Sequence, residues 1–390
     1  MADPADRAAI VGAGHTRFGA LREGPRELLR QAVDLAEASV DRGWGRDPPD
    51  AAFLATLGFG GWQLGNASAL LAEEAHRVGC PVIRVENACA SGGSALEAGV
   101  RAIESGRADR VLVAGLEKMT DLPSARRRYW LGVSGDTEWE RLAGLTFAGV
   151  YALLASAHRS AFGTPPEALA EVAVKNHRNG LRNPNAHFRR EITRDQVLAA
   201  PRVADPLGLY DCCPVRDGAA ALLLVRSSEA RRYTDTPVLV AGLGSASDYL
   251  AVQERPLRTG LAATRQAARQ AFRHAPFDRD GLSFVEVHDC FTIAELLALE
   301  DLGLAPPGGA AEMTLAGATA RTGALPVNPD GGLKSKGHPI GATGVSQVYE
   351  VFRQLRGDAG ERQVPGAARA LTHNVGGSGA SAVVALFEAA

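Results

Sequence analysis

A pair of matching segments constrains the fold of this chain more than any other feature of its sequence. Residues 89–106 align without gaps with the segment that begins at His338, so that Cys89 falls opposite His338 and Gly92 opposite Gly341. In each segment a reactive residue precedes a helix that starts with small residues, and an apolar strand follows. Self-similarity of this kind predicts an α/β unit that is duplicated within the chain.

Strand and helix patterns alternate through both halves. Apolar strands are predicted at residues 8–14, 110–119 and 369–375, and helical periodicity runs over 26–43 and 341–355. Such alternation produces a mostly parallel sheet with helices packed on its faces. The expected fold class is therefore α/β.

The stretch from about residue 120 to residue 212 differs from its surroundings. It is rich in Arg, Asn, Pro and Gly, and its hydrophobic periodicity is less regular. We expect it to be an inserted, surface-exposed region. The expected parts of the chain are an N-terminal half, an inserted domain and a C-terminal half, at residues 1–117 completed by 213–232, 118–212 and 233–390.

Composition excludes several classes of protein. The formal net charge of -2 leaves no basic surplus for nucleic acid or acidic lipid. The five cysteines form no CxxC pair, so we expect neither a disulfide framework nor a metal site. The N-terminus does not resemble a signal peptide, and no apolar run is long enough to span a membrane. A reduced, cytoplasmic protein is expected.

Cys89 lies at the start of a predicted helix and is surrounded by Ala, Ser and Gly. A thiol at this position feels the positive end of the helix dipole and nearby backbone N–H groups, which favour the thiolate. The small neighbours leave room for a substrate, and the backbone N–H of Cys89 can point into the site. The alternative is an inert cysteine that fills a tight contact between helix and sheet.

His338 is the counterpart of Cys89 in the repeat, within a loop that is rich in glycine. A histidine close to the thiol could accept its proton and activate it. A lone histidine is more often a capping or core residue. Here the repeat and the density of glycine favour the catalytic interpretation.

A second candidate loop follows a strand rich in valine, where the sequence reads VEVHDCF. Because successive side chains alternate faces, His288 and Cys290 share one face and Asp289 points elsewhere. A metal site from all three is therefore geometrically poor. His288 could donate a hydrogen bond to an oxyanion, and Cys290 could move protons or simply fill the core.

Two further segments leave their function open. The turn at residues 373–380 could present backbone N–H groups to an oxyanion, or it could be purely structural. Arg126, Arg127 and Arg128 form either a solvated patch or a phosphate contact.

These loops together resemble the thiolase superfamily over essentially the whole chain. The resemblance rests on NACASGG, HDCF, GGLKSKGHPIGATG and the Gly-rich C-terminal turn. HDCF indicates the branch of the sterol-carrier-protein thiolases and their archaeal and bacterial relatives, the acetyl-CoA acetyltransferases. The resemblance implies a five-layered αβαβα fold of two similar halves, a dimer, and an inserted domain at 118–212 that covers the coenzyme A site.

The resemblance also implies roles for the site residues. Cys89 would be the nucleophile, His338 would activate it and help form the first oxyanion hole, and His288 would line that same hole. Backbone N–H groups of Cys89 and Gly376 would form the second hole. Many thiolases carry another catalytic cysteine where this chain has Asn374, and in the HDCF branch the cysteine of the tetrapeptide, here Cys290, is thought to act as acid and base instead.

The expected activity is cleavage of 3-oxoacyl-CoA by CoA, or the reverse Claisen condensation, without a metal or redox cofactor. A decarboxylating ketoacyl synthase is the nearest rival, because Cys89, His288 and His338 could supply its catalytic set; it would not need Cys290. A retro-aldolase is disfavoured by the presence of Cys89. A non-catalytic scaffold that assembles with a small zinc-ribbon/OB-fold protein is a third possibility, and such a partner is also compatible with an active enzyme.

Overall fold

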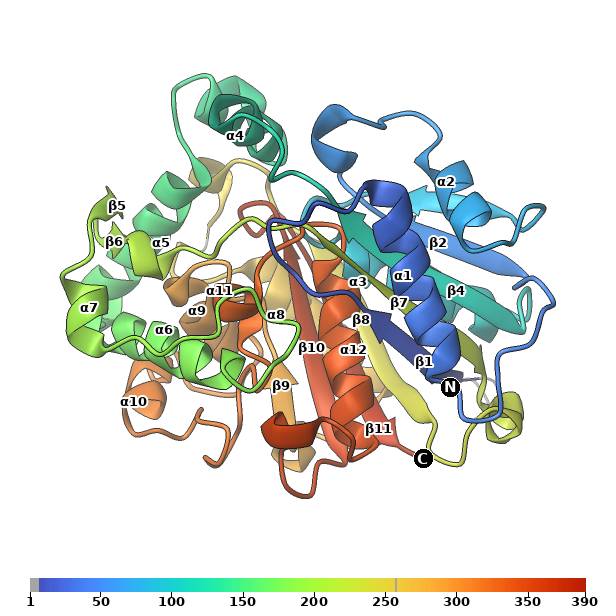
Figure 1. The fold of residues 1–390 in the computed structure, drawn as a ribbon. Helices are drawn as coiled ribbons and strands as arrows, with labels where there is room; N and C mark the ends of the chain where they lie inside the picture. The colour runs from blue at the N-terminus through green and yellow to red at the C-terminus, as the bar shows by residue number, and fades with distance from the viewer. Residues whose placement is uncertain (1–6, 257) are drawn as a thin grey trace.

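Strands of both halves form one nine-stranded sheet in the computed structural model, which describes residues 7–256 and 258–390. The order is β3-β2-β4-β7-β1-β8-β11-β10-β9. In Figure 1 the N-terminal half lies at the right in blue, and the strands of the C-terminal half lie at the centre. The strands are β1 Ala8–His15, β2 Ala51–Ala55, β3 Val82–Val85, β4 Arg110–Glu117, β7 Gly218–Arg226, β8 Val238–Ser247, β9 Phe284–Glu286, β10 Arg369–Gly376 and β11 Ser381–Ala389.

The two halves of the sheet mirror each other about the junction of β1 with β8. Going outward from this junction, one half runs β1-β7-β4-β2-β3 and the other runs β8-β11-β10-β9. β2 is parallel to β3 and β4, and β9 is parallel to β10, whereas the strands nearer the junction pair antiparallel. The expectation of a mostly parallel sheet is therefore wrong. The junction itself is short, since Ala9 pairs with Leu239 and Ile10 with Val238.

Helices fill three layers around the strands. α3 and α12 contact each other and strands of both halves, so they form the middle layer. α1 and α2 pack on the N-terminal strands, and α8 packs on β8 and β11, which gives the predicted αβαβα order. The helices are α1 Pro25–Ala38, α2 Ala67–Glu74, α3 Ser91–Glu104, α8 Ala262–His274, α9 Thr292–Asp301, α10 Ala310–Leu315, α11 Gly332–Lys336 and α12 Thr343–Leu355.

Glycines allow the same close approach of helix and strand in both halves. A Cβ on Gly14 of β1 would lie 2.1 Å from the carbonyl oxygen of Ala32 in α1, and one on Gly244 of β8 would lie 2.2 Å from that of Ala267 in α8. No side chain fits at such distances. The equivalent contacts support the duplication that the sequence predicts.

Residues 118–212 contribute the green helices and the small hairpin at the left and top of Figure 1. Their elements are α4 Ser124–Gly132, α5 Phe147–Phe162, α6 Pro166–Gly180, α7 Arg194–Leu198, β5 Arg202–Ala204 and β6 Leu207–Gly208. The expectation of an irregular, surface-exposed region is wrong for α6, which packs against α9, α10 and α11. The described ranges contain no helix with the length and hydropathy that a membrane span requires.

Polar side chains of α6 are buried because they bind the C-terminal half. Lys175 donates a 2.9 Å hydrogen bond to the carbonyl of Val327, and Asn179 donates one of the same length to that of Asn328. The composition of this helix therefore reflects internal hydrogen bonding rather than exposure to water.

Candidate active site

Three sequence-predicted side chains converge from three loops. The potential ligand atoms of Cys89, His288 and His338 all lie within 4.8 Å of one another. The two imidazole rings meet edge to face, with centroids 5.1 Å apart. Cys89 precedes α3, His288 follows β9, and His338 precedes α12, so the duplicated halves bring the thiol and both histidines together.

These side chains line a cavity of about 670 Å³, and Cys290 lines it as well. Residues 118–212 supply much of its lining, with Tyr151 and Phe147 of α5 among them. As the alternation of side chains predicts, Asp289 faces away from this group: its carboxylate accepts hydrogen bonds from the backbone N–H groups of Leu333 and Lys334.

His338 is oriented by the first residue of the helix that follows it, α12. Its Nδ1 lies 2.7 Å from the hydroxyl of Thr343, and this hydroxyl donates to the carbonyl of Pro339 at 2.9 Å. Because the hydroxyl has a single proton, it accepts from Nδ1–H of the histidine. Nε2 then carries the lone pair, and it is buried without a hydrogen-bond partner among the described residues. Burial lowers the pKa of His338 to about 3, so the ring is neutral.

His288 is almost fully buried, with 2% of its surface exposed. Burial, reinforced by the neighbouring His338 and His373, lowers its pKa well below the ordinary value. Its Nδ1 lies 3.2 Å from the side-chain nitrogen of Asn374 on β10. His288 is therefore a second neutral imidazole that faces the thiol.

Cys89 is a protonated thiol in the resting protein. Burial raises its pKa to about 12, and the opposing effect of the backbone N–H of Gly377 is smaller. The expectation that the helix start favours the thiolate is wrong here, because α3 begins two residues later, at Ser91, and desolvation dominates. The thiol consequently needs a base at the moment of attack.

Cys290 is also protonated, since burial raises its pKa far above the ordinary value. The hydroxyl of Tyr151, which hydrogen-bonds to Cys290, lowers that pKa in part. The Tyr151 ring stacks on Phe291 with centroids 4.5 Å apart, which places the hydroxyl beside the thiol. Sequence reasoning missed Tyr151, because no motif surrounds it and its helix lies in the segment expected to be irregular.

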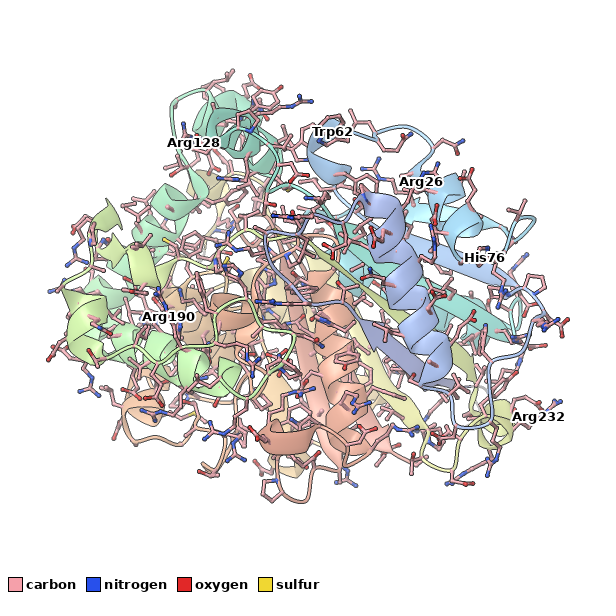
Figure 2. All side chains as sticks on the ribbon, in the orientation of Figure 1. Arg26, Trp62, His76, Arg128, Arg190 and Arg232 are labelled. Atoms are coloured by element: carbon pink, nitrogen blue, oxygen red, sulfur yellow. The ribbon has the colours of Figure 1, made fainter. Side chains whose placement is uncertain are left out.

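The predicted arginine cluster diverges in space. Of the three, only Arg128 lines the cavity, and Figure 2 shows it on α4 at the top of the molecule. Arg126 lies beside Gly61 instead, and Arg127 lies near Arg216. Arg141, which sequence reasoning missed, also lines the cavity and stacks on Tyr129.

Gly376 ends strand β10, and the next residue, Gly377, is the one that lines the cavity. The use of Gly376 N–H in an oxyanion hole stays a prediction. So does the absence of a metal, although Cys89, His288 and His338 are close enough to share a soft cation.

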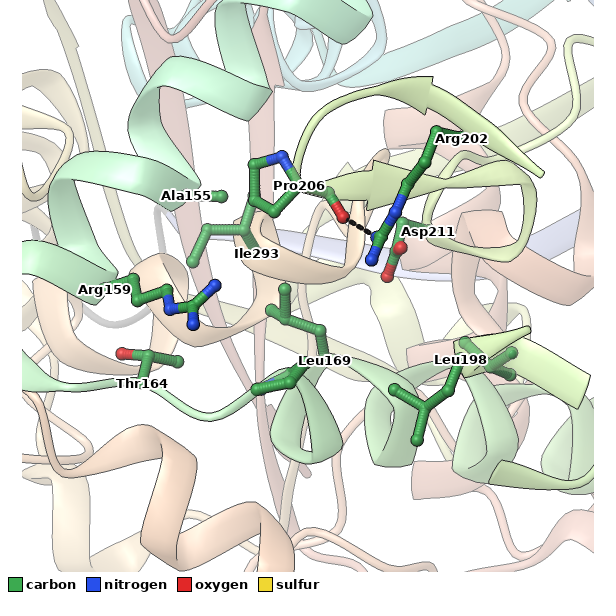
Figure 3. A pocket seen from close by; sticks show the side chains of 11 residues that line it. Ala155, Arg159, Thr164, Leu169, Leu198, Arg202, Pro206, Asp211 and Ile293 are labelled. Atoms are coloured by element: carbon green, nitrogen blue, oxygen red, sulfur yellow. Dashed lines mark hydrogen bonds between the residues drawn. The ribbon is translucent and has the colours of Figure 1, made fainter. Parts of the chain in front are cut away.

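A separate cavity of about 80 Å³ lies between α5, α6 and the β5–β6 hairpin (Figure 3). Arg202 on its wall is bound to the carbonyl of Pro206, and Asp211 accepts from Gly208 N–H and from the hydroxyl of Thr292. None of the four predicted catalytic residues lines it.

Two family models match nearly the whole chain. Residues 8–228 match the thiolase N-terminal domain, and residues 244–389 match the domain described as thiolase C-terminal domain-like. The chain is 43% identical over 383 residues to the acetyl-CoA acetyltransferase of Methanothermobacter thermautotrophicus, covering 97% of this chain and 98% of that protein. It is 34% identical to sterol carrier protein 2 of Homo sapiens, covering 98% of this chain and 72% of that protein.

Solved structures with the same fold include two instructive cases. An Ltp2-ChsH2(DUF35) aldolase superposes with a TM-score of 0.84 at 24% identity, covering 97% of each chain. An acetyl-CoA acetyltransferase from Syntrophomonas wolfei superposes with a TM-score of 0.72 at 19% identity, covering 98% of this chain and 99% of that one. At these identities the likeness establishes the fold. Together with the two domain matches and the full-length relatives, it leads to one conclusion: the chain belongs to the thiolase family and is a thiolase-type acyltransferase.

Proposed function

We propose that the enzyme cleaves 3-oxoacyl-CoA thioesters with CoA, or runs the reverse condensation, through an acyl group carried on Cys89. The observation that carries the proposal is the placement of two thiols and two neutral histidines on one cavity. The similarity to archaeal acetyl-CoA acetyltransferases supports short acyl-CoA substrates.

In the first half-reaction, the lone pair of His338 Nε2 takes the proton of Cys89. The thiolate attacks the 3-oxo carbonyl, and the bond between C2 and C3 breaks with its electron pair moving to C2. This leaves the shortened acyl group as a thioester on Cys89 and the enolate of acetyl-CoA. His288 faces the oxygen on which charge develops; one such donor contributes on the order of 3 kcal/mol.

Cys290 would complete this half-reaction by protonating C2 of the enolate. Its raised pKa keeps it protonated, as a proton donor must be. In the condensing direction it must instead remove the C2 proton, and the Tyr151 hydroxyl would stabilise the resulting thiolate. CoA then attacks the acyl thioester and takes the acyl group; its thiol proton passes to the Cys290 thiolate, and the departing Cys89 thiolate recovers the proton held by His338.

The rival interpretations lack this support. A decarboxylating synthase needs no second thiol, whereas Cys290 lies on the cavity wall. The aldolase structure is similar in fold alone, and Cys89 is retained here. A non-catalytic scaffold would have no need for four titratable side chains on one cavity.

Arg128 and Arg141 are the arginines that line the cavity, and we propose that they contact the phosphates of CoA. Arg128→Ala should raise KM for CoA several-fold and spare kcat at saturation. Arg126→Ala is the matched control, because Arg126 lies on the same helix, also exposed, and does not line the cavity. Equal effects of both substitutions would reduce the role of Arg128 to general surface charge.

We propose a homodimer whose two chains join through β3, because β3 is an edge strand and Ile83 on it is 59% exposed. A small partner protein of the zinc-ribbon/OB-fold type is proposed by analogy with the aldolase, which is a complex with a DUF35 protein.

We further propose a cytoplasmic role in lipid metabolism. The five cysteines are all free, as a reducing compartment keeps them.

The decisive experiment incubates the enzyme with a panel of 3-oxoacyl-CoAs plus CoA, and separately with acetyl-CoA and with malonyl-CoA. We expect thiolysis of at least one 3-oxoacyl-CoA and an acyl adduct on the peptide that contains Cys89, detected by mass spectrometry. Release of carbon dioxide from malonyl-CoA without thiolysis would favour the synthase. Acylation at Cys290 alone would show that Cys89 is not the nucleophile.

A further inference from the structure

We propose that Asn374 is a positioning residue that holds His288 in the tautomer with its proton on Nε2, so that His288 presents a hydrogen-bond donor to the oxyanion. The inference deepens the proposed function and rests on it. It concerns a residue that has no titratable group and that touches the reacting atoms only through His288.

The orientation of the Asn374 amide is set by two backbone groups. Its Oδ1 accepts a 3.0 Å hydrogen bond from the N–H of Gly93, and its Nδ2 donates a 2.9 Å hydrogen bond to the carbonyl of Cys89. A backbone N–H can only donate and a carbonyl can only accept. Reversing the amide would break both bonds at once, so one orientation is selected.

The second proton of Nδ2 is therefore available to His288, whose Nδ1 lies 3.2 Å away. Since the amide nitrogen has no lone pair to offer, Nδ1 of His288 must be the acceptor. His288 is neutral, and a neutral imidazole with a lone pair on Nδ1 carries its proton on Nε2. The free nitrogen of His288 is thus a donor, as an oxyanion requires.

Packing leaves the Asn374 side chain no alternative position. It is 2% exposed and lies between α3 and α12. A Cβ on Gly344 would lie 2.3 Å from Asn374 Oδ1, and a Cβ on Gly93 would lie 3.1 Å from it. Both helices of the middle layer therefore carry glycine where this side chain enters, which confines the amide to the geometry that orients His288.

Asn374→Asp tests the idea because it keeps the shape and removes both donors. We expect the proton of His288 to move to Nδ1, where the carboxylate accepts it, and kcat for thiolysis to fall on the order of 10²–10³-fold, the usual loss for one oxyanion donor. KM for CoA should change less than about two-fold, because the loss is confined to the transition state.

The pH dependence of kcat distinguishes a role of Asn374 in positioning His288 from a purely structural role in holding α3 in place (bracing of α3). A carboxylate beside His288 favours the imidazolium, which donates from both nitrogens, so Asn374→Asp should recover activity relative to wild type as the pH falls. Asn374→Ala has no such carboxylate and should show no recovery. The other titratable groups that face His288 are Cys89, His338 and His373, and they are the same in both variants.

Ser94→Ala is the matched structural control. It removes the 3.1 Å hydrogen bond from Asn87 to the same helix and does not touch His288. We expect its kcat to stay within about two-fold of wild type. A loss as large as that of Asn374→Asp would show that bracing of α3 explains the effect, and would overturn the proposal.

Nitrogen-15 NMR of the imidazoles gives a readout that does not depend on turnover. The signal of His288 is identified by its absence in His288→Gln, and its couplings distinguish a proton on Nε2 from one on Nδ1. A proton on Nδ1 in the active wild-type enzyme would overturn the role of Asn374, even if the aspartate variant fails to fold. If His288 carries its proton on Nε2 but the enzyme cleaves no 3-oxoacyl-CoA, the result would instead count against the proposed function.

Discussion

His338 and His288 face the same thiol, are both buried and neutral, and are nevertheless held in different ways. Thr343, five residues further along the chain at the start of α12, orients His338. Asn374, on a different strand and 86 residues away, contacts His288. The Thr343 hydroxyl accepts from Nδ1–H of His338, so the lone pair of that ring is on Nε2. The Asn374 amide donates to Nδ1 of His288, so the proton of that ring is on Nε2. The comparison teaches that the partner of Nδ1, rather than the residue type, decides whether a histidine acts as base or as donor.

The largest effect is expected when each of the two histidines is replaced by glutamine in a separate variant. Glutamine can donate a hydrogen bond but cannot take a proton at neutral pH. His338→Gln should therefore lower kcat on the order of 10⁴-fold, at the upper end for a lost general base. His288→Gln should cost only about 10-fold, because a donor remains. Single-turnover acylation of Cys89, measured for both variants, checks this.

His288→Ala completes that test, since it removes the donor as well as the ring. It should lose on the order of 10²–10³-fold. Equal losses for the two glutamine variants would break the comparison, because both histidines would then act in the same way.

Cys290→Ser gives the next largest effect and asks whether the loop of His288 carries a second function. Acylation of Cys89 should persist, while thiolysis and exchange of the acetyl-CoA α-proton should fall about 10³-fold, because a serine hydroxyl is a far weaker acid than a thiol. Hydrogen–deuterium exchange of acetyl-CoA, followed by mass spectrometry, provides the measurement. Normal exchange in this variant would leave Cys290 as a core residue.

Thr343→Val is expected to have a smaller effect on the other histidine. It removes the acceptor of His338 Nδ1–H and leaves the shape of the side chain, so the ring loses its preferred tautomer and kcat should fall roughly 10-fold. Thr343→Ser retains the hydroxyl and should restore most of the activity. If the valine and serine variants behave alike, the orientation of His338 does not depend on this hydroxyl.

The smallest effect concerns stability. Because the pKa of His338 is about 3 when folded and near 6.5 when unfolded, the unfolded chain binds the extra proton between these values. The stability associated with the neutral ring is present above pH 6.5 and is lost as the pH falls toward 3. Between pH 7 and pH 5 this amounts to about 2 kcal/mol.

His338→Gln should therefore show a weaker decline than wild type over that range, in urea unfolding measured at pH 7 and pH 5. An identical decline in both proteins would mean that His338 does not resist protonation in the folded state.

The sequence by itself determined the duplicated α/β architecture, the loops before α3 and α12, and four side chains of the site: Cys89, His288, Cys290 and His338. These features could be predicted because they are local: periodicity, small residues at a helix start and alternation along a strand act over a few residues. The contact of Thr343 with His338 is also local, although the sequence did not reveal the direction of its hydrogen bond.

Only the tertiary structure decided the burial of α6, the protonated state of Cys89, the approach of Tyr151 to Cys290 and the orientation of the Asn374 amide. Each depends on groups far apart in the chain; Asn374 and Cys89, for example, are 285 residues apart. Desolvation and hydrogen-bond direction are set by whatever surrounds an atom after folding, and a pattern of neighbouring residues carries no record of those surroundings.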